Sequence, residues 1–470
     1  MFGLSKEMLL KRQIMLFLDK QTESVPSQAV TNDVQSVTNQ TIRKYLQELQ
    51  VSIEKLYSSE KMELQINRRS GIELIRRDTN FDALFEEILS QDIIYAVFQK
   101  LILSRSFFTK PFCEEQDVSL SKLRRKINNL NHFLNPFGLY VTVGKKVTMN
   151  GEESHIRFLF FSFLYFIHRR LTSIPWVNEK KYLDLAEQVC YLLYIEPRCS
   201  KVEMIGLWLF VNMQAHKENR LLETLSLQED FLIEIPRPNF LTSFEDEDWQ
   251  FFIAVLYATD LIDIDPNINF DRIHHNDFSE ATRDWIEEFE CKFKDLSIQE
   301  KKEVTLMMYK CDLLNKIMPL NDTLGVVFNS VDSESIKQQY PIFGQTFDEF
   351  WTAFSEKNPL LVDTYIKSKS FMLALKLSPA KLLFTAIDFS LVSSLTLDDQ
   401  ERIKQQLTNY FYNKAKISFI HNPKKAEIIV TTEAFEDKEV FDGEMVVINP
   451  VLTQNDLNYL EETIEKVATN

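Results

Sequence analysis

Hydrogen-bonding side chains recur at matching positions in two stretches of this sequence. Residues 37–49 (VTNQTIRKYLQEL) and residues 118–130 (VSLSKLRRKINNL) align at an offset of 81 residues. Each stretch would place amides, hydroxyls and cations on one face of a helix: Gln40, Lys44 and Gln47 with Arg43 at the flank, and Ser121, Arg125 and Asn128 with Arg124 at the flank. Such side chains can bond to base edges or phosphates when a helix lies in the major groove of DNA. The repeat therefore predicts two recognition helices.

Both stretches have the sequence of an amphipathic helix with a capped start. Thr38 and Ser119 each follow a valine and are the expected N-caps, because their hydroxyls can accept hydrogen bonds from the first turn. Apolar residues recur three or four positions apart, as one buried face requires: Ile42, Tyr45, Leu46 and Leu49, and Leu123, Ile127 and Leu130. At about 100° per residue, the polar residues point away from that buried face.

The segments around each stretch complete the pattern of a winged helix-turn-helix domain. A short helix is predicted before each one, around residues 26–34 and residues 109–115, followed by a tight turn. After each comes a hairpin with alternating apolar residues and a basic tip: Leu64 and Ile66 before Arg68-Arg69-Ser70-Gly71 and a return strand at residues 72–75, and Val141 and Val143 before Gly144-Lys145-Lys146 and a return strand at residues 147–149. Such hairpins would be wings that touch phosphates or the minor groove. The predicted DNA-binding residues are Thr38, Asn39, Gln40, Arg43, Lys44, Gln47, Arg68, Arg69, Ser119, Ser121, Lys122, Arg124, Arg125, Asn128, Lys145 and Lys146.

The distribution of charge agrees with this location. Residues 1–150 hold 21 Lys and Arg against 17 Asp and Glu, whereas the rest of the chain carries a net charge of −20. A protein with a pI near 5.1 is repelled overall by a polyanion, so any contact with nucleic acid needs a local basic surface. The N-terminal third is the candidate for that surface.

Length and composition predict several folded, mainly helical domains. The chain has 470 residues, 45% of them hydrophobic, and only nine glycines. The cysteines are odd in number, lack metal-ligand spacing and are expected to be reduced: Cys113, Cys190, Cys199, Cys291 and Cys311. No signal peptide opens the chain, and its apolar runs are shorter than the roughly 20 residues that a bilayer requires. We therefore expect a soluble, cytoplasmic protein with no membrane contact, no metal and no cofactor.

The remaining two thirds divide into a helical part and a mixed part. From about residue 151 to residue 382 the apolar period is helical and fits two bundles, with a boundary near residues 265–277 that includes Pro266 and His274-His275. From Leu383 onward the spacing of apolar residues is no longer helical throughout, and strand patterns alternate with helical ones. Strands at residues 383–389, 417–420, 426–432 and 445–448 and helices at residues 398–411 and 454–467 predict a small α/β domain.

In this order of parts the chain resembles the Mga/anthrax-toxin-activator family of global and virulence transcriptional regulators from Gram-positive bacteria. The resemblance rests on an opening helix with Leu10, Ile14, Phe17 and Leu18, the two helix-turn-helix stretches, the long helical middle and the α/β tail. It implies a DNA-binding transcriptional activator rather than an enzyme. It also implies winged helix-turn-helix domains at residues 1–78 and 79–151, phosphotransferase-system regulation domains at residues 152–270 and 271–382, and an enzyme IIB-like domain at residues 383–470.

Two departures from the family pattern bear on regulation. Enzyme IIB domains carry a phosphorylated cysteine after their first strand, but here the loop contains Ser390-Leu391-Val392-Ser393-Ser394, and no cysteine follows Cys311. Regulation domains can be phosphorylated on histidine, which adds roughly −1.5 to −2 charge. His216 is the candidate in the first bundle, where His155 and His168 lie on the opening helix, and no histidine occurs between His275 and His421. The tail is therefore expected to serve folding or self-association as a homodimer. For His216 two interpretations stay open: an ordinary polar surface histidine, or an acceptor of phosphate from a phosphocarrier of the transport system.

Three other functions fit parts of the sequence. An RNA-binding antiterminator also carries paired regulation domains, but it begins with a small all-β domain, whereas this chain opens with helices. A cytosolic phosphocarrier or small-molecule enzyme needs a nucleophile with a partner base, or a glycine-rich phosphate loop, and neither pattern is found. A helical scaffold would bind no nucleic acid at all. Binding to double-stranded DNA separates these alternatives from the predicted regulator.

Overall fold

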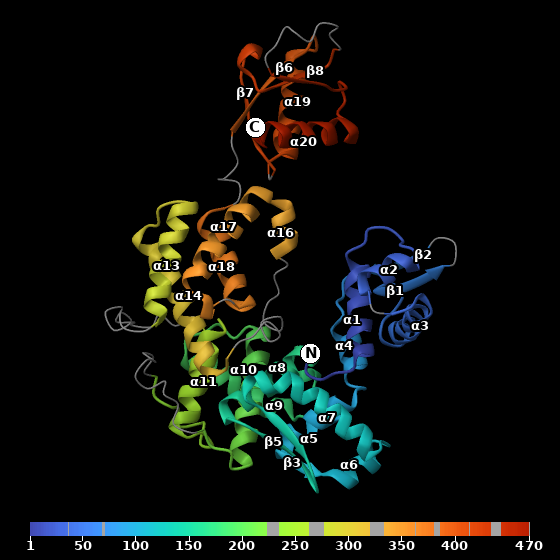
Figure 1. Ribbon diagram of the computed structural model, residues 1–470, viewed down its shortest axis with the longest axis vertical. Helices are drawn as coiled ribbons and strands as arrows, with labels where there is room; N and C mark the ends of the chain where they lie inside the picture. The colour runs from blue at the N-terminus through green and yellow to red at the C-terminus, as the bar shows by residue number, and fades with distance from the viewer. Residues whose placement is uncertain are drawn as a thin grey trace. The chain divides into compact units, whose positions relative to one another are not determined.

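A computed structural model describes residues 1–35, 37–67, 71–222, 235–262, 277–319, 333–361, 363–379, 386–412, 414–433 and 443–469. The protein is mostly helical, with short sheets near the N-terminus and one small sheet domain at the C-terminal end (Figure 1). It forms two compact units: Met1–His275 with Tyr309–Val327, and Asn276–Met308 with Phe328–Asn470. No helix in the described ranges is long and apolar enough to cross a membrane.

The first N-terminal module, which the sequence predicts to be a winged helix-turn-helix domain, has the predicted element order. Helices α1 (Lys6–Asp19), α2 (Ser27–Val34) and α3 (Asn39–Leu56) precede the antiparallel hairpin of β1 (Met62–Asn67) and β2 (Gly71–Arg76). Val25, just before α2, bridges to Ile72 of β2 and adds a minimal third strand. The apolar residues of α1 and α3 that the sequence singled out form one core, which α4 (Asp82–Leu89) completes.

The second module repeats this arrangement. It consists of α5 (Ile93–Ser104), β3 (Ser106–Phe108), α6 (Thr109–Glu115), α7 (Leu120–Leu134), η1 (Asn135–Phe137), β4 (Tyr140–Val143) and β5 (Lys146–Asn150). The sheet order is β3-β5-β4 and all pairs are antiparallel. The predicted helices and hairpin strands of both modules are confirmed; β3 was not predicted, because three residues are too few to show a period of two.

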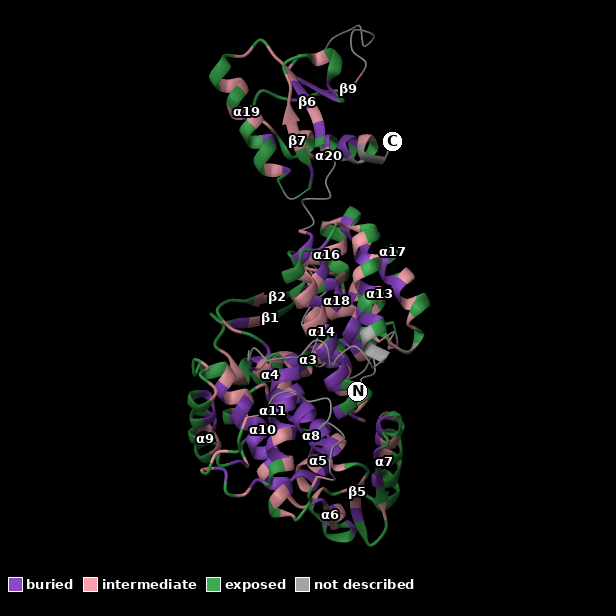
Figure 2. Cartoon of the chain, turned by 90° about the vertical axis from the view of Figure 1, so that its left-hand side faces the viewer, coloured by how far each residue is buried: buried purple, intermediate pink, exposed green. Residues whose placement is uncertain are grey.

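A helical bundle follows in the same unit. Its helices are α8 (Glu153–His168), α9 (Glu179–Leu192), α10 (Cys199–Lys217) and α11 (Asp246–Ala258), with η2 (Leu171–Ser173) after α8. Buried residues run almost all the way round α8, α10 and α11 (Figure 2), and Phe161 stacks on Trp208 with ring centres 3.8 Å apart. Helix α8 also completes the second module, since Phe163 stacks on Phe98 of α5 at 3.9 Å. The predicted boundary at residue 151 thus separates two elements that share a core.

The second unit contains further helices and the C-terminal α/β domain. The helices are α13 (Asp277–Lys292), α14 (Ile298–Ile317, to Met308 in this unit), α16 (Ser333–Gln339), α17 (Pro341–Lys357) and α18 (Thr364–Leu377), with η4 (Pro359–Leu361) between the last two. Trp285 stacks on Phe289 with ring centres 5.1 Å apart and donates a hydrogen bond to Ser370. The predicted boundary near residues 265–277 lies outside the described residues except at Asp277. Within the described parts of residues 151–379 there is no strand, as predicted.

The C-terminal domain has a parallel sheet of order β7-β6-β8-β9. Its elements are β6 (Ala386–Val392), α19 (Leu397–Tyr410), β7 (Lys416–Phe419), η6 (Pro423–Lys425), β8 (Ile428–Thr431), β9 (Glu444–Val447) and α20 (Gln454–Thr469). Residues 383–385 of the predicted first strand lie outside the described residues. The other strands and both helices are confirmed to within a few residues, and their apolar faces share one core.

Candidate nucleic-acid interface and regulatory histidine

Helix α3 begins at the predicted cap. The Thr38 hydroxyl accepts a hydrogen bond from the backbone N–H of Thr41 at 3.3 Å. Ile42 and Leu46 on the inner side are fully buried at 0% exposure. Because these two residues fix the rotation of the helix, its opposite side faces solvent.

The outer face of α3 carries the predicted reading residues. Gln40, Arg43, Lys44 and Gln47 are all exposed. Lys44 lies 3.5 Å from Glu48, and Lys11 of α1 lies 2.7 Å from the other oxygen of the same carboxylate. An exposed ion pair of this kind is worth only about 0–1 kcal/mol. Lys44 therefore stays free to exchange Glu48 for a phosphate.

Asn39 occupies a different position from its neighbours. Its amide nitrogen donates to the side-chain oxygen of Gln28 on α2 at 2.8 Å, and its amide oxygen accepts from the hydroxyl of Thr31 on the same helix. These bonds tie the start of α3 to α2. Asn39 thus fixes the angle between the two helices of the motif, a role that the sequence pattern did not indicate.

Helix α7 presents the second set of predicted residues. The Ser119 hydroxyl caps it by accepting from the backbone N–H of Lys122 at 3.2 Å. The other predicted residues of this helix are exposed: Ser121, Lys122, Arg124, Arg125 and Asn128. Neither Arg124 nor Arg125 has an ion-pair or hydrogen-bond partner among the described residues, so both guanidinium groups are available to an anion.

The wing of the second module is braced against α6. Thr109, which begins α6, donates from its hydroxyl to the carbonyl of Gly144 at 2.8 Å and from its N–H to the carbonyl of Lys145 at 3.1 Å. The Lys146 ammonium lies 5.0 Å from the ring centre of Phe108, and both tip lysines are exposed. In the first module the tip residues Arg68, Arg69 and Ser70 lie outside the described residues.

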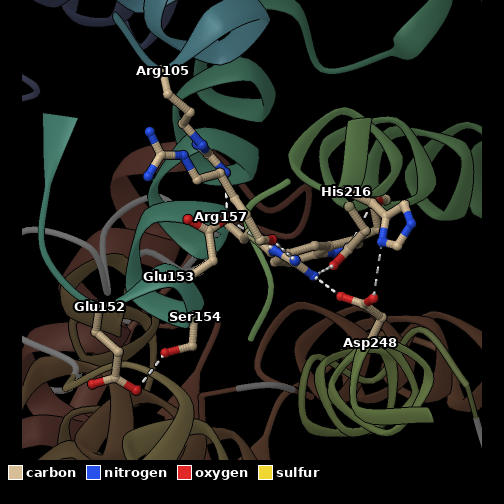
Figure 3. Close-up of polar contacts among 10 residues, drawn as sticks. Arg105, Glu152, Glu153, Ser154, Arg157, His216 and Asp248 are labelled. Carbon is tan, nitrogen blue, oxygen red and sulfur yellow. Dashed lines mark hydrogen bonds and ion pairs between the residues drawn. The ribbon is translucent and has the colours of Figure 1, made fainter. Parts of the chain in front are cut away.

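His216 is half-buried near the end of α10. Its Nδ1 is buried and lies 3.6 Å from Oδ2 of Asp248 on α11, and the other ring nitrogen points away from that carboxylate (Figure 3). The side chain keeps 28% of its surface exposed. The sequence suggested an ordinary position at a helix edge. The carboxylate that faces the ring comes from another helix and gave no sequence signal.

A buried network extends from Asp248. The fully buried Arg157 on α8 donates from Nη1 to Asp248 Oδ1 at 2.6 Å and to Asn212 at 2.9 Å, and from Nε to Glu153 at 3.1 Å (Figure 3). Its remaining nitrogen donates to the carbonyl of Arg220 at 2.8 Å. The guanidinium is thus satisfied on all sides, as a buried charge must be.

The same network reaches the second N-terminal module through Arg105. This residue caps the C-terminal end of α5 at a φ of +55°, and one of its nitrogens pairs with the Glu153 carboxylate that Arg157 also binds. Burial lowers the pKa of the Arg105 guanidinium to about 10. Its Nε and Nη1 have no hydrogen-bond partner among the described residues. Alternating charges therefore connect His216 with the end of α5.

The two histidines of α8, His155 and His168, contact the second N-terminal module. His168 is 2% exposed, and its Nε2 lies 3.0 Å from the Tyr95 hydroxyl of α5. His155 lies with Nδ1 3.0 Å from the carbonyl of Phe137. Across the described residues, no three His, Cys, Asp or Glu side chains gather as they would around a metal ion.

Comparison with known families supports the second module directly. Residues 77–164 match the family model of the Mga helix-turn-helix domain. The matched stretch contains α4, the whole second module and most of α8, which agrees with the core that α5 and α8 share. A search of curated proteins finds no match to the chain.

Proposed function

We propose that this chain is a transcriptional activator of the Mga type that binds double-stranded DNA in the cytoplasm through two winged helix-turn-helix modules, and the match of residues 77–164 to the Mga helix-turn-helix domain supports this. One observation carries this proposal. Two capped helices at equivalent positions, α3 and α7, each expose cations and amides on the side opposite the module core. Amides and guanidinium groups on a major-groove helix can read bases, and lysines on a wing can bind phosphates.

For α7, we propose that Arg124, Arg125 and Asn128 face the DNA and that Ser119 acts chiefly as a cap. For α3, Gln40, Arg43, Lys44 and Gln47 would contact DNA, whereas Thr38 and Asn39 would hold the helix in place. The hydrogen bonds described above support this assignment, because the side-chain polar atoms of Thr38 and Asn39 are already bonded within the helix-turn-helix motif.

We further propose that the helical part links DNA binding to the state of a sugar phosphotransferase system. His216 would accept a phosphoryl group from a phosphocarrier protein. Its partly exposed ring and the Asp248 carboxylate beside Nδ1 support this, because a carboxylate next to one ring nitrogen can orient the imidazole. The C-terminal domain would contribute to a homodimer, as most soluble oligomers are symmetric dimers.

The test of DNA binding uses the full chain with a random-sequence 40-base-pair duplex in mobility-shift and anisotropy measurements. We expect retention at low salt, with log affinity falling by about 0.9 per phosphate neutralised as log salt rises. The double substitution Arg124→Ala, Arg125→Ala should weaken binding and reduce that slope. The matched control is Lys180→Ala, Lys181→Ala, two adjacent exposed cations on α9, and it should change neither. Equal effects of the two pairs would contradict the proposed surface.

Selection of bound duplexes from a random pool then tests base reading. Gln40→Ala or Gln47→Ala should relax the selected sequence by roughly 1–3 kcal/mol of discrimination if these amides contact bases. A protein that retains single-stranded RNA and no duplex DNA would favour the antiterminator function instead.

A further inference from the structure

The first residues of the chain pack behind the second recognition helix. Phe2 is completely buried at 0% exposure. Its ring lies 5.1 Å from Phe133 on α7 and 5.6 Å and 5.4 Å from Phe163 and Phe166 on α8, measured between ring centres. In Figure 1 the N-terminus accordingly lies beside these helices. Residues Met1–Ser5, which precede α1, are called the N-terminal hook below.

The hook lies directly on the backbone of α7. Gly3 has a φ of +66°, and a Cβ atom at this position would come within 2.8 Å of the Cα atom of Leu130. Such an approach is closer than side chains tolerate, and the backbone conformation favours glycine. Leu130 lies on the same helix as Arg124 and Arg125, on its buried face. Any side chain at position 3 would therefore push against the second recognition helix.

Polar contacts fix the end of the hook to the same module. The backbone N–H of Ser5 donates to the Asp92 carboxylate at 2.9 Å, and Asp92 also caps α5 by accepting from Ile94 at 2.9 Å. Lys126 on α7 lies 3.5 Å from the same carboxylate, which is 3% exposed. The hook, the start of α5 and the side of α7 thus meet at one buried acidic group.

The hook continues without a break into the first module. It leads into α1, whose Leu10, Ile14 and Leu18 belong to the core around α3. The Arg12 guanidinium of α1 lies between the rings of Phe85 and Phe166, at 5.1 Å and 5.3 Å from their centres. The first module is therefore attached to the second both by the linker helix α4 and by the hook.

We infer that the N-terminal hook positions α7 relative to α3, so that the two recognition helices bind one DNA duplex as a fixed pair. Phe2 and Gly3 are the positioning residues. The inference rests on the proposed function, since it concerns how the same surface meets DNA. Once the first module has bound DNA, a fixed pair holds the second module at a high effective concentration near the same duplex. Loosening the contact between the hook and α7 lowers that effective concentration. The hook thereby affects affinity without touching DNA.

The test measures whether the contributions of the two modules are coupled through the hook. Anisotropy with a 40-base-pair random-sequence duplex compares the full chain with Phe2→Ala and Gly3→Ala, each with and without Arg43→Ala, Lys44→Ala on α3. We expect each hook variant to bind about tenfold more weakly. Removal of the α3 cations should then weaken a hook variant less than it weakens the wild type, which is the signature of coupling in a double-mutant cycle.

Controls separate positioning from general loss of stability. Phe2→Leu keeps an apolar side chain in the pocket and should restore most of the affinity. Phe354→Ala removes an equally buried phenylalanine in the second unit and should leave DNA binding unchanged. In the DNA-free protein, amide hydrogen exchange along Leu120–Leu134 should speed up in Gly3→Ala, while that along Asn39–Leu56 stays as in the wild type.

The outcomes distinguish the inference from the function on which it rests. A wild-type chain that retains no duplex at low salt overturns the proposed function, and with it the paired binding. If the wild type binds but Phe2→Ala and Gly3→Ala keep its affinity, its salt slope and an additive response to the α3 substitutions, only the hook is overturned. Failure of Phe2→Leu to restore affinity, together with loss of binding in Phe354→Ala, also counts against positioning.

Discussion

Replacement of Asp248 by asparagine should destabilise the first helical bundle far more than its small change in shape suggests. Asp248 is 2% exposed, and its carboxylate accepts from Arg157 at 2.6 Å and from the backbone N–H of Glu245 at 3.1 Å, which caps α11. The asparagine side chain keeps an oxygen for the cap but removes the charge. Arg157 and Arg105, both buried, would then share Glu153 as their one carboxylate within the described network.

The size of the effect follows from burial. Removing one partner of a buried ion pair typically costs about 3–5 kcal/mol, because the other charge stays buried without compensation. Asp246, two residues away, provides the matched control: its side chain is 78% exposed and lies 2.9 Å from Arg237. An exposed pair contributes only about 0–1 kcal/mol. Asp248→Asn and Asp246→Asn should thus differ by roughly 2–5 kcal/mol in the free energy of local opening.

Amide hydrogen exchange is the suitable assay, because a chain of several domains does not unfold in one transition. We expect faster exchange in α8 and α11 of Asp248→Asn, and wild-type exchange in Asp246→Asn. Adding Arg157→Met to Asp248→Asn should recover part of the loss, since it removes the stranded cation and leaves Glu153 paired with Arg105. Equal protection of α8 and α11 in the two single variants would refute the assignment of Asp248 to a buried charge network.

His216→Ala should abolish phosphoryl transfer from a phosphocarrier while leaving binding to random duplex DNA unchanged. Transfer is measured with phosphocarrier that carries a labelled phosphoryl group, and DNA binding is measured by anisotropy. A His216→Ala protein that still becomes labelled would show that another residue accepts the phosphoryl group. Deleting residues 383–470 should reduce self-association in analytical ultracentrifugation but preserve DNA retention, and an intact dimer would locate association in the helices. Lys294, with Ser297, lowers the pKa of the Glu300 carboxyl to about 2. A depressed folded-state pKa gives stability above the unfolded value that is lost as pH falls. Protection factors, in which the slower intrinsic exchange in acid is already corrected for, should therefore fall at the start of α14 from about pH 4.5 towards about pH 2 in the wild type and lose this pH dependence in Glu300→Gln.

Local patterns account for what the sequence predicted well. The caps Thr38 and Ser119 and the three- or four-residue apolar spacing that follows them are properties of single helices, so the starts of α3 and α7 were predicted to within a residue. Both helices continue beyond the predicted stretches, to Leu56 and Leu134. The exposed faces then followed from helix geometry alone. The charge difference between the N-terminal third and the rest pointed to the same region.

Long-range contacts account for what the sequence did not predict. Phe2 meets Phe133 and Phe166 across more than a hundred residues, and no spacing rule connects them. Arg157 lies near the start of the apolar run of residues 156–167, whose length was compared only with that of a membrane span. An arginine in such a run does carry a signal, because a buried guanidinium requires a carboxylate, but the identity of Asp248 as that partner comes only from the fold.

The loop after β6, where enzyme IIB domains carry their phosphorylated cysteine, is held by hydrogen bonds to the segment after β8. The backbone N–H of Ser394 donates to the Glu433 carboxylate at 3.0 Å, and the Ser393 hydroxyl lies 2.6 Å from that of Thr432. Thr396 caps α19 by accepting from Asp399 at 3.3 Å. A phosphate approaching this loop would have to displace Glu433, a group of the same charge sign, from the N–H that holds it. The loop therefore stabilises the connection between β6 and β8, and the proposed role of the domain in self-association has to be sought on its outer surfaces.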